Sequence, residues 1–157
     1  MSTVLIDEIT RALNSMKETG EVDLSIANNL DGLANLFKES KEKWLTSPDT
    51  KVNFYFYYAA RIAELVVSRM KERFLSLKQV NDNPKIAKYS LQILGLLGEL
   101  LDLTRKEKPD GGVAKLAIER VTQLRAVAVD TKLLQSEEKE LEDIDKLLQY
   151  RQRLQHR

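Results

Sequence analysis

Apolar residues recur three and four positions apart along most of this chain, which is the spacing of a helix that packs one face against a core. Clusters of turn-forming residues interrupt the pattern near 47–50, 81–84 and 108–112, and each cluster contains one proline. Only the aromatic run at 54–58 departs from helical spacing, and it continues directly into a helical pattern. The pattern predicts an all-α fold, a single-domain bundle of about six helices over residues 1–157 with one or two long helices.

Two central helices stand out in this pattern. Residues 51–79 form the longest periodic segment, with two adjacent apolar stripes that need two neighbours. A helix of this length spans roughly 43 Å, so we expect part of it to project beyond the core. The next helix begins at Pro84 and is apolar on nearly every side, which predicts that Leu94, Leu97 and Leu101 are core residues.

Several single residues predict local features of these helices. Gly20 is available as a cap at the end of the first helix, and Ser136 is an N-cap candidate for the last. Gly95 and Gly98 lie three apart on one face, where each lowers helix stability by roughly 1 kcal/mol relative to alanine. They therefore predict a close approach of two helices.

Composition excludes several functional classes. The 157 residues include no cysteine and one histidine, so disulfides, cysteine-based zinc sites and thiol nucleophiles are ruled out. The formal net charge of +1 provides no overall field toward nucleic acid or a membrane. No apolar run approaches the ~20 residues of a membrane span, and the first residues do not have the pattern of a secretory signal. We expect a cytoplasmic protein that does not bind membranes.

The chain offers no recognisable catalytic machinery. It has no glycine-rich phosphate loop and no nucleophile elbow, and His156 stands alone near the C-terminus. The six acids within 136–145 read as a solvated helix face that complements the helix dipole. We therefore expect a protein that is not an enzyme and that has no catalytic, cofactor-binding or metal-binding residues.

An aromatic run at 54–58 holds five of the ten aromatic residues, since the chain has one Trp, five Tyr and four Phe. Five consecutive positions point around the whole circumference of a helix, so a core on one side buries only two or three of them. Either a second long helix covers the others, or they form the centre of a subunit interface, where aromatic residues are enriched. The candidate interface residues are Phe54, Tyr55, Tyr57 and Tyr58.

A modest basic stretch surrounds the second break in the pattern. It is interrupted by Glu64 and Glu72 and has few aromatic residues on which bases could stack. It is read either as a solvated face or as a site of weak, salt-sensitive contact with a nucleic-acid backbone. The candidate contacts are Arg61, Arg69, Lys71, Arg73, Lys85 and Lys88.

Residues 116–154 resemble the end of the helical domain in archaeal subunits of the GINS replication complex. In that family a helix of the form R-x-x-K-I-x-x-L-A is followed by a leucine, a paired acidic step and a helix that closes on a Tyr-Arg step. Gln123 stands where lysine is usual, and the chain ends at Arg157 where many members continue into a small β domain. The matching residues are Arg120, Leu124, Val127, Ala128, Leu134, Glu137, Glu138, Leu141, Tyr150 and Arg151.

The resemblance, which covers about a quarter of the chain, implies a non-enzymatic interaction or assembly subunit. Such a subunit would belong to a helical tetramer of the DNA replication machinery, bridging the MCM helicase ring to a RecJ-like partner. Its partners would be protein subunits of a larger complex, including further copies of itself. The alternative is a small helical subunit of a ribonucleoprotein complex that binds the nucleic-acid backbone, like the small subunits of CRISPR effector complexes.

Overall fold

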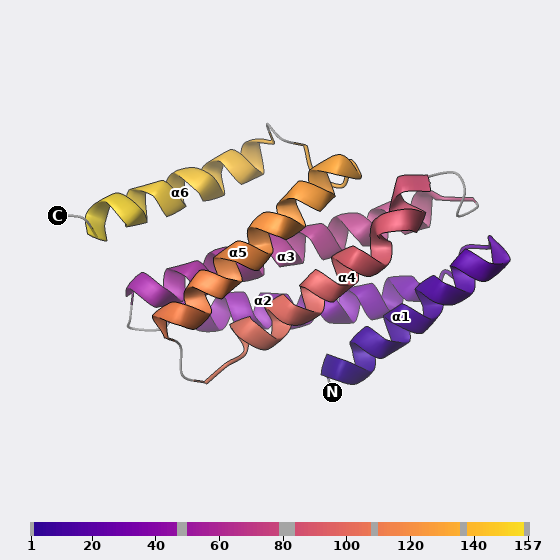
Figure 1. Ribbon diagram of the computed structural model, residues 1–157, viewed down its shortest axis with the longest axis horizontal. Helices are drawn as coiled ribbons and strands as arrows, with labels where there is room; N and C mark the ends of the chain where they lie inside the picture. The colour runs from indigo at the N-terminus through magenta and orange to yellow at the C-terminus, as the bar shows by residue number, and fades with distance from the viewer. Residues whose placement is uncertain (1, 47–49, 79–83, 108–109, 136–137, 156–157) are drawn as a thin grey trace.

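The computed structural model describes residues 2–46, 50–78, 84–107, 110–135 and 138–155. Within these ranges the chain forms six helices and no sheet, which confirms the predicted all-α bundle (Figure 1). None of the described helices is long and apolar enough to cross a membrane. The helices are α1 (Ser2–Thr19), α2 (Ile26–Thr46), α3 (Thr50–Ser76), α4 (Pro84–Thr104), α5 (Gly111–Asp130) and α6 (Lys139–Gln155).

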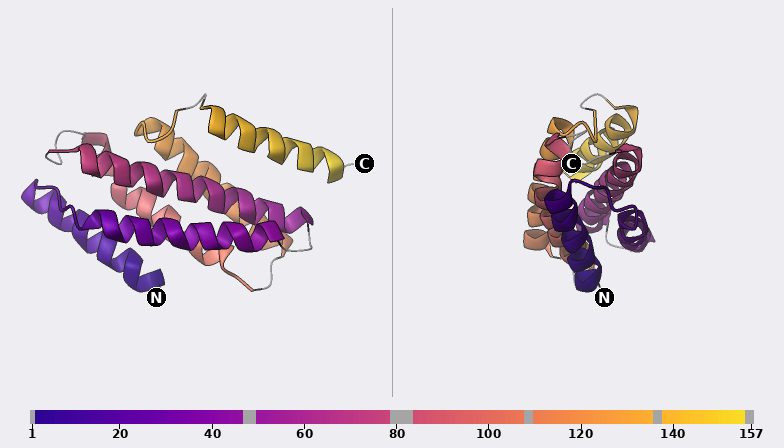
Figure 2. Two further views of the ribbon diagram at one scale, coloured as in Figure 1. Left: turned by 180° about the vertical axis from the view of Figure 1, so that it is seen from behind. Right: turned by 90° about the vertical axis from the view of Figure 1, so that its right-hand side faces the viewer.

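The helices lie in two layers. Helices α1, α4 and α5 form the layer nearer the viewer in Figure 1, and α2, α3 and α6 form the other layer, which Figure 2 shows from behind. α3 is the centre of the bundle, because it packs against α2, α4, α5 and α6. α6 packs mainly against α3 and lies at the edge of its layer.

Buried side chains from all six helices form one continuous hydrophobic cluster. Leu94, Leu97 and Leu101 of α4 are each at most 1% exposed, so their prediction as core residues is confirmed. The ring of Trp44 stacks on Phe56 with centroids 4.8 Å apart, and its indole N–H donates to the carbonyl of Thr104 at 2.6 Å. This hydrogen bond satisfies the polar atom of a buried ring, which ties α2, α3 and α4 together.

α3 does not project beyond the core, so that expectation was wrong. Its buried side chains run from Asn53 to Phe74, close to both ends of the helix. Because α3 has four packed neighbours rather than two, nearly every side of it meets another helix. The four neighbours of α3 also explain how the aromatic side chains at 54–58, which point around the whole helix, can be buried or half-buried.

Local signals at the helix ends are partly confirmed. Gly20 ends α1 with φ +75°, and its N–H donates to the carbonyl of Met16. A Cβ placed at Gly98 would meet Ile6 of α1 at 3.9 Å, an ordinary van der Waals contact, and one placed at Gly95 would meet nothing within 4 Å. The prediction that these glycines mark a close approach of two helices was therefore wrong. Ser136, the predicted N-cap of the last helix, lies outside the described residues.

Candidate protein-interaction surface

The structure buries half of the predicted aromatic interface inside the chain itself. Phe54 is 8% exposed and Tyr58 is 4% exposed, while Tyr55 and Tyr57 are half-buried and pack against the core. Phe54 and Tyr58 are therefore core residues of one chain, which corrects the prediction that these two lie at a subunit interface. A contact between subunits at Tyr57 stays a prediction.

Tyr58 belongs to a hydrogen-bonded network that sequence reasoning missed. Its hydroxyl accepts a hydrogen bond from Arg125 Nη1 of α5 at 2.6 Å and donates one to Asp145 Oδ1 of α6 at 3.0 Å. Burial raises the pKa of this hydroxyl above its usual value, the positive charge of Arg125 opposes that rise, and Asp145 adds to it. The network holds α6 onto α3 and α5.

α2 and α6 run antiparallel to α3 on either side of its exposed face. On one side, Lys71 pairs with Asp31 at 2.8 Å and Phe56 stacks on Trp44. On the other side, the paired residues are Arg69 with Glu138 and Tyr58 with Asp145. Figure 2 shows the three helices side by side in this order in its left-hand view.

A groove follows the exposed face of α3 between these two helices, and we call it the α3 groove. Its described cavity has a volume of about 190 Å³. Its floor comes from α3, one wall from α2 and the other wall from α6, so three segments far apart in the sequence meet there. The lining residues are Lys41, Arg61, Glu64, Leu65, Ser68 and Glu140.

One end of the α3 groove is apolar. Leu45 lies one helical turn beyond Lys41 on the same face of α2, and it is 66% exposed. Leu147 lies two turns beyond Glu140 on the same face of α6 and is 46% exposed, and Tyr150 follows at 52%. Because α2 and α6 both run antiparallel to α3, these side chains lie toward the end of the groove where Tyr57 stands. We call Leu45, Tyr57, Leu147 and Tyr150 the apolar end.

The charged residues that line the groove are two bases, Lys41 and Arg61, and two acids, Glu64 and Glu140. Lys41 and Glu64 form an ion pair at 2.8 Å, and so they neutralise each other. Arg61, between this pair and the apolar end, is half-buried and makes no hydrogen bond or ion pair with any residue that the structure describes. The exposed residues of α6 near the apolar end carry both signs of charge, since Lys146 and Arg153 are accompanied by Glu142 and Asp143.

Of the other predicted nucleic-acid contacts, Arg69, Arg73 and Lys85 all reach residues 130–133 at the end of α5, where they donate to the chain's own carbonyl groups. Arg69 pairs with Glu138, and Lys71 pairs with Asp31. On α4, Lys85 lies 3.5 Å from a carboxylate oxygen of Asp130, and the ammonium of Lys88 lies 5.2 Å from the ring centre of Tyr89. The acids beside most of these side chains neutralise them, which does not favour binding to a nucleic-acid backbone.

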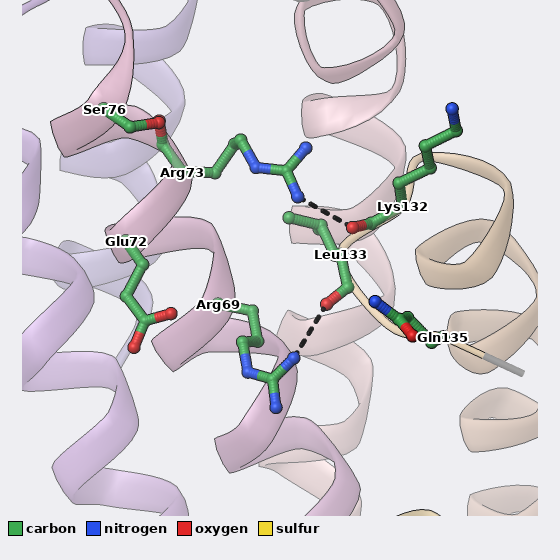
Figure 3. A pocket seen from close by; sticks show the side chains of 7 residues that line it. All are labelled: Arg69, Glu72, Arg73, Ser76, Lys132, Leu133 and Gln135. Atoms are coloured by element: carbon green, nitrogen blue, oxygen red, sulfur yellow. Dashed lines mark hydrogen bonds between the residues drawn. The ribbon is translucent and has the colours of Figure 1, made fainter. Parts of the chain in front are cut away.

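Arg69 and Arg73 line a second cavity of about 320 Å³ between α3 and the connection from α5 to α6 (Figure 3). In Figure 3 both guanidinium groups point toward that connection, where Arg73 donates to the carbonyl of Lys132 at 2.7 Å and Arg69 to that of Leu133 at 3.4 Å. The side chain of Lys132 extends away from the two arginines, and Glu72 stands on the opposite wall. These arginines satisfy the carbonyl groups at the end of α5.

Sequence reasoning also missed the exposed apolar residues outside the aromatic run. Leu147 and Tyr150 form a second stripe on α6, beside the buried stripe of Leu141 and Ile144. The sequence contains this signal, because Leu147 and Tyr150 fall on a helical face outside the core-facing stripe of Leu141 and Ile144. Among the described residues, no group of three or more His, Asp or Glu is placed to hold a metal ion.

Comparison with known proteins adds no relative. No protein-family model matches the chain, and no curated protein or solved structure matches it. The resemblance to GINS subunits therefore stays a prediction. The structure itself defines the class of protein, an all-α bundle in two layers.

Proposed function

We propose that this protein is a non-enzymatic assembly subunit that binds another protein through the α3 groove and its apolar end. The proposal is supported by the exposure of Leu45, Leu147 and Tyr150, on the two helices that flank α3, and by the placement that helix geometry gives Leu45 and Leu147 toward the end of the groove where Tyr57 stands. Exposed apolar residues that gather at a groove, with polar residues around them, are typical of protein interaction sites. Aromatic residues such as Tyr57 and Tyr150 often contribute most of the binding energy at such sites.

The resemblance of residues 116–154 to GINS subunits suggests where to look for the partner. These residues include most of α5 and nearly all of α6, and α6 supplies Leu147 and Tyr150. We propose the DNA replication machinery, in the cytoplasm, as the first setting to test. Binding to a nucleic-acid backbone is less favoured, because ion pairs with acids neutralise Arg69, Lys71 and Lys85.

The test is affinity capture of the tagged protein from the cells that make it, with mass spectrometry of the co-purifying proteins. We compare the natural chain with the double variant Leu147→Ser and Tyr150→Ser. The variant should lose its protein partners and keep its helical circular dichroism, since both side chains are exposed and the buried Leu141 and Ile144 still hold α6.

The matched control is Leu24→Ser, because Leu24 is 62% exposed and precedes α2 rather than lining the groove. It should retain the same partners as the natural chain. Capture of an identical set of proteins by the double variant would show that the apolar end is not the binding surface and would overturn the proposal.

A further inference from the structure

We infer that α6 is exchangeable between two copies of this chain, so that it leaves its own bundle and takes the same place on a second copy. The surface that holds α6 is here called the α6 seat, and it is marked by Tyr58 and Arg69 of α3 and by Arg125 of α5. The occupant is defined by the structure, because α6 itself fills this seat within one chain. The inference does not depend on what the α3 groove binds.

Few buried side chains hold α6 in place. Among its described side chains Leu141 and Ile144 are buried, and Leu148 is partly buried and packs against the core. α5, which is of similar length, buries five residues. α6 also packs mainly against one helix, α3, and lies at the edge of its layer (Figure 2). A helix with so little buried apolar surface opens at a lower free energy than the centre of the bundle.

α6 can leave without disturbing the end of α5. Leu133 and Leu134 are buried, and their N–H groups donate to the carbonyl of Ala128 at 2.8 and 3.1 Å, so the turn after α5 is held by its own contacts. Gln135 is exposed, and its N–H donates to Glu138 Oε2 at 3.2 Å, which belongs to the segment that would move. The change of direction that an exchange needs can therefore begin at Gln135.

The α6 seat is specific for the residues of α6. Arg125 forms a bidentate pair with Asp145, and Tyr58 donates to the same carboxylate. Arg69 pairs with Glu138, seven positions earlier in the chain. Shielded charges that lose their partners are unfavourable, so an open seat favours a segment that supplies both acids beside an apolar pair. The α6 of a second copy supplies the same side chains in the same geometry.

The exchange would make the α3 groove a site shared by two chains. Glu140 of the groove and Leu147 and Tyr150 of the apolar end all belong to α6, so each groove would be completed by the second copy. An exchanged dimer repeats the seat contacts of two closed monomers. What it loses is the high effective concentration of a tethered helix, and protein concentration therefore decides between the two forms.

A charge exchange at the bidentate pair tests the inference. Arg125→Asp alone brings two carboxylates together, and Asp145→Arg alone brings two cations together, so each variant weakens the hold on its own α6. In a mixture, the first variant still offers Asp145 to Arg125 of the second variant. The arginine introduced in the second variant meets the aspartate introduced in the first. Both pairs are restored only when the two chains exchange α6.

Sedimentation velocity of the mixture should show a dimer whose dissociation constant is at least about tenfold below that of the natural chain, equal to about 1.4 kcal/mol. Each variant alone should associate less than the mixture. One chain that carries both Arg125→Asp and Asp145→Arg restores the pair within itself and should stay monomeric where the mixture dimerises. Circular dichroism checks that all three are helical, and if either single variant unfolds, Arg69→Glu mixed with Glu138→Arg gives the same readout.

The matched control is the ion pair of Lys85 with Asp130, at 3.5 Å between α4 and α5, which does not involve α6. A mixture of Lys85→Asp with Asp130→Lys should sediment as its components do. The inference is overturned by a mixture of α6 variants that stays monomeric, and equally by a control mixture that dimerises to the same extent. The capture experiment with Leu147→Ser and Tyr150→Ser measures other proteins, so this inference and the proposed function fail separately.

Discussion

Arg125 of α5 and Asp145 of α6 form a bidentate ion pair, with Nη1 at 2.7 Å from Oδ1 and Nη2 at 3.0 Å from Oδ2. The side chain of Arg125 is 24% exposed and that of Asp145 is 33% exposed. A bidentate ion pair has a defined geometry as well as a favourable energy. Because α6 packs mainly against α3, this pair is an additional anchor that fixes α6 on the bundle.

Asp145→Asn should weaken that anchor. The amide keeps one acceptor for Arg125 but loses its charge, so we expect the free energy of unfolding to fall by about 1–2 kcal/mol. Amide hydrogen exchange in α6 should rise more than exchange in α3. Asp143→Asn, an exposed position two residues earlier, is the control and should change neither quantity. Equal effects of the two variants would show that the ion pair does not hold α6.

Tyr58 predicts a specific loss of stability at alkaline pH. Its pKa is raised above 10.0 in the folded chain, so the folded state holds the hydroxyl proton more tightly than the unfolded state does. The stability from this group is complete below about pH 10 and decreases as the pH rises through the folded pKa.

Chemical denaturation over this pH range checks that expectation. Tyr58→Phe should have a flatter decline of unfolding free energy above pH 10 than the natural chain, although it starts from a lower value because two hydrogen bonds are lost. Tyr150→Phe, which changes an exposed tyrosine, should decline as the natural chain does. Parallel curves for all three proteins would contradict the prediction.

Leu97 lies at the centre of the core, where it is fully buried on α4. Leu97→Ala should lower the free energy of unfolding by about 2–5 kcal/mol, through lost burial and the cavity that remains. Glu142→Ala on the exposed side of α6 should change it by less than about 0.5 kcal/mol. Urea denaturation of the two variants measures both values, and the opposite ranking would mean that α4 is not central.

Asn53 is a polar residue in the core of the bundle. It is 2% exposed, and neither atom of its amide group has a hydrogen-bond partner among the residues that the structure describes. Asn53→Leu replaces the amide with an apolar group of similar shape and should raise the free energy of unfolding by about 1–3 kcal/mol. Asn35→Leu, on the exposed side of α2, should change it little. A destabilised Asn53→Leu variant would show that the amide has a partner, such as a buried water.

The helical architecture was predictable because burial imposes its period on the sequence. The apolar stripes of α4 identified Leu94, Leu97 and Leu101 as core residues without any knowledge of the neighbouring helices. The burial of Phe54 and Tyr58 was not predictable in this way, because it depends on how many helices surround α3. Periodicity shows that a face is apolar but not how many partners cover it.

The candidate surface was harder to predict, for a related reason. Arg125 lies 67 positions from Tyr58 and 20 positions from Asp145, so their network exists only after the helices are packed. Leu45 lies beside the predicted break at 47–50, where the helical pattern gives no indication of its environment, and it is 66% exposed. The pairing of Lys71 with Asp31 likewise joins segments that no local pattern connects.

Lys132 provides the last prediction, because it adopts a left-handed backbone conformation with φ 63°. It follows the C-cap Thr131 of α5, and the N–H groups of Lys132 and Leu133 donate to the carbonyls of Val129 and Ala128 at 3.0 and 2.8 Å. This is the arrangement in which glycine is usually found, since a side chain there is disfavoured by about 1–2 kcal/mol.

Lys132→Gly should therefore raise the free energy of unfolding by about 1 kcal/mol, part of the relief being offset by the greater freedom of glycine in the unfolded chain. The bond from Arg73 remains, because its acceptor is the backbone carbonyl of residue 132. Lys115→Gly removes the same charge from the exposed side of α5, where the helix continues, and should lower stability by about 1 kcal/mol. Thermal denaturation of the two variants gives opposite shifts if the backbone conformation decides the outcome, and shifts of the same sign if the lysine charge or glycine flexibility does.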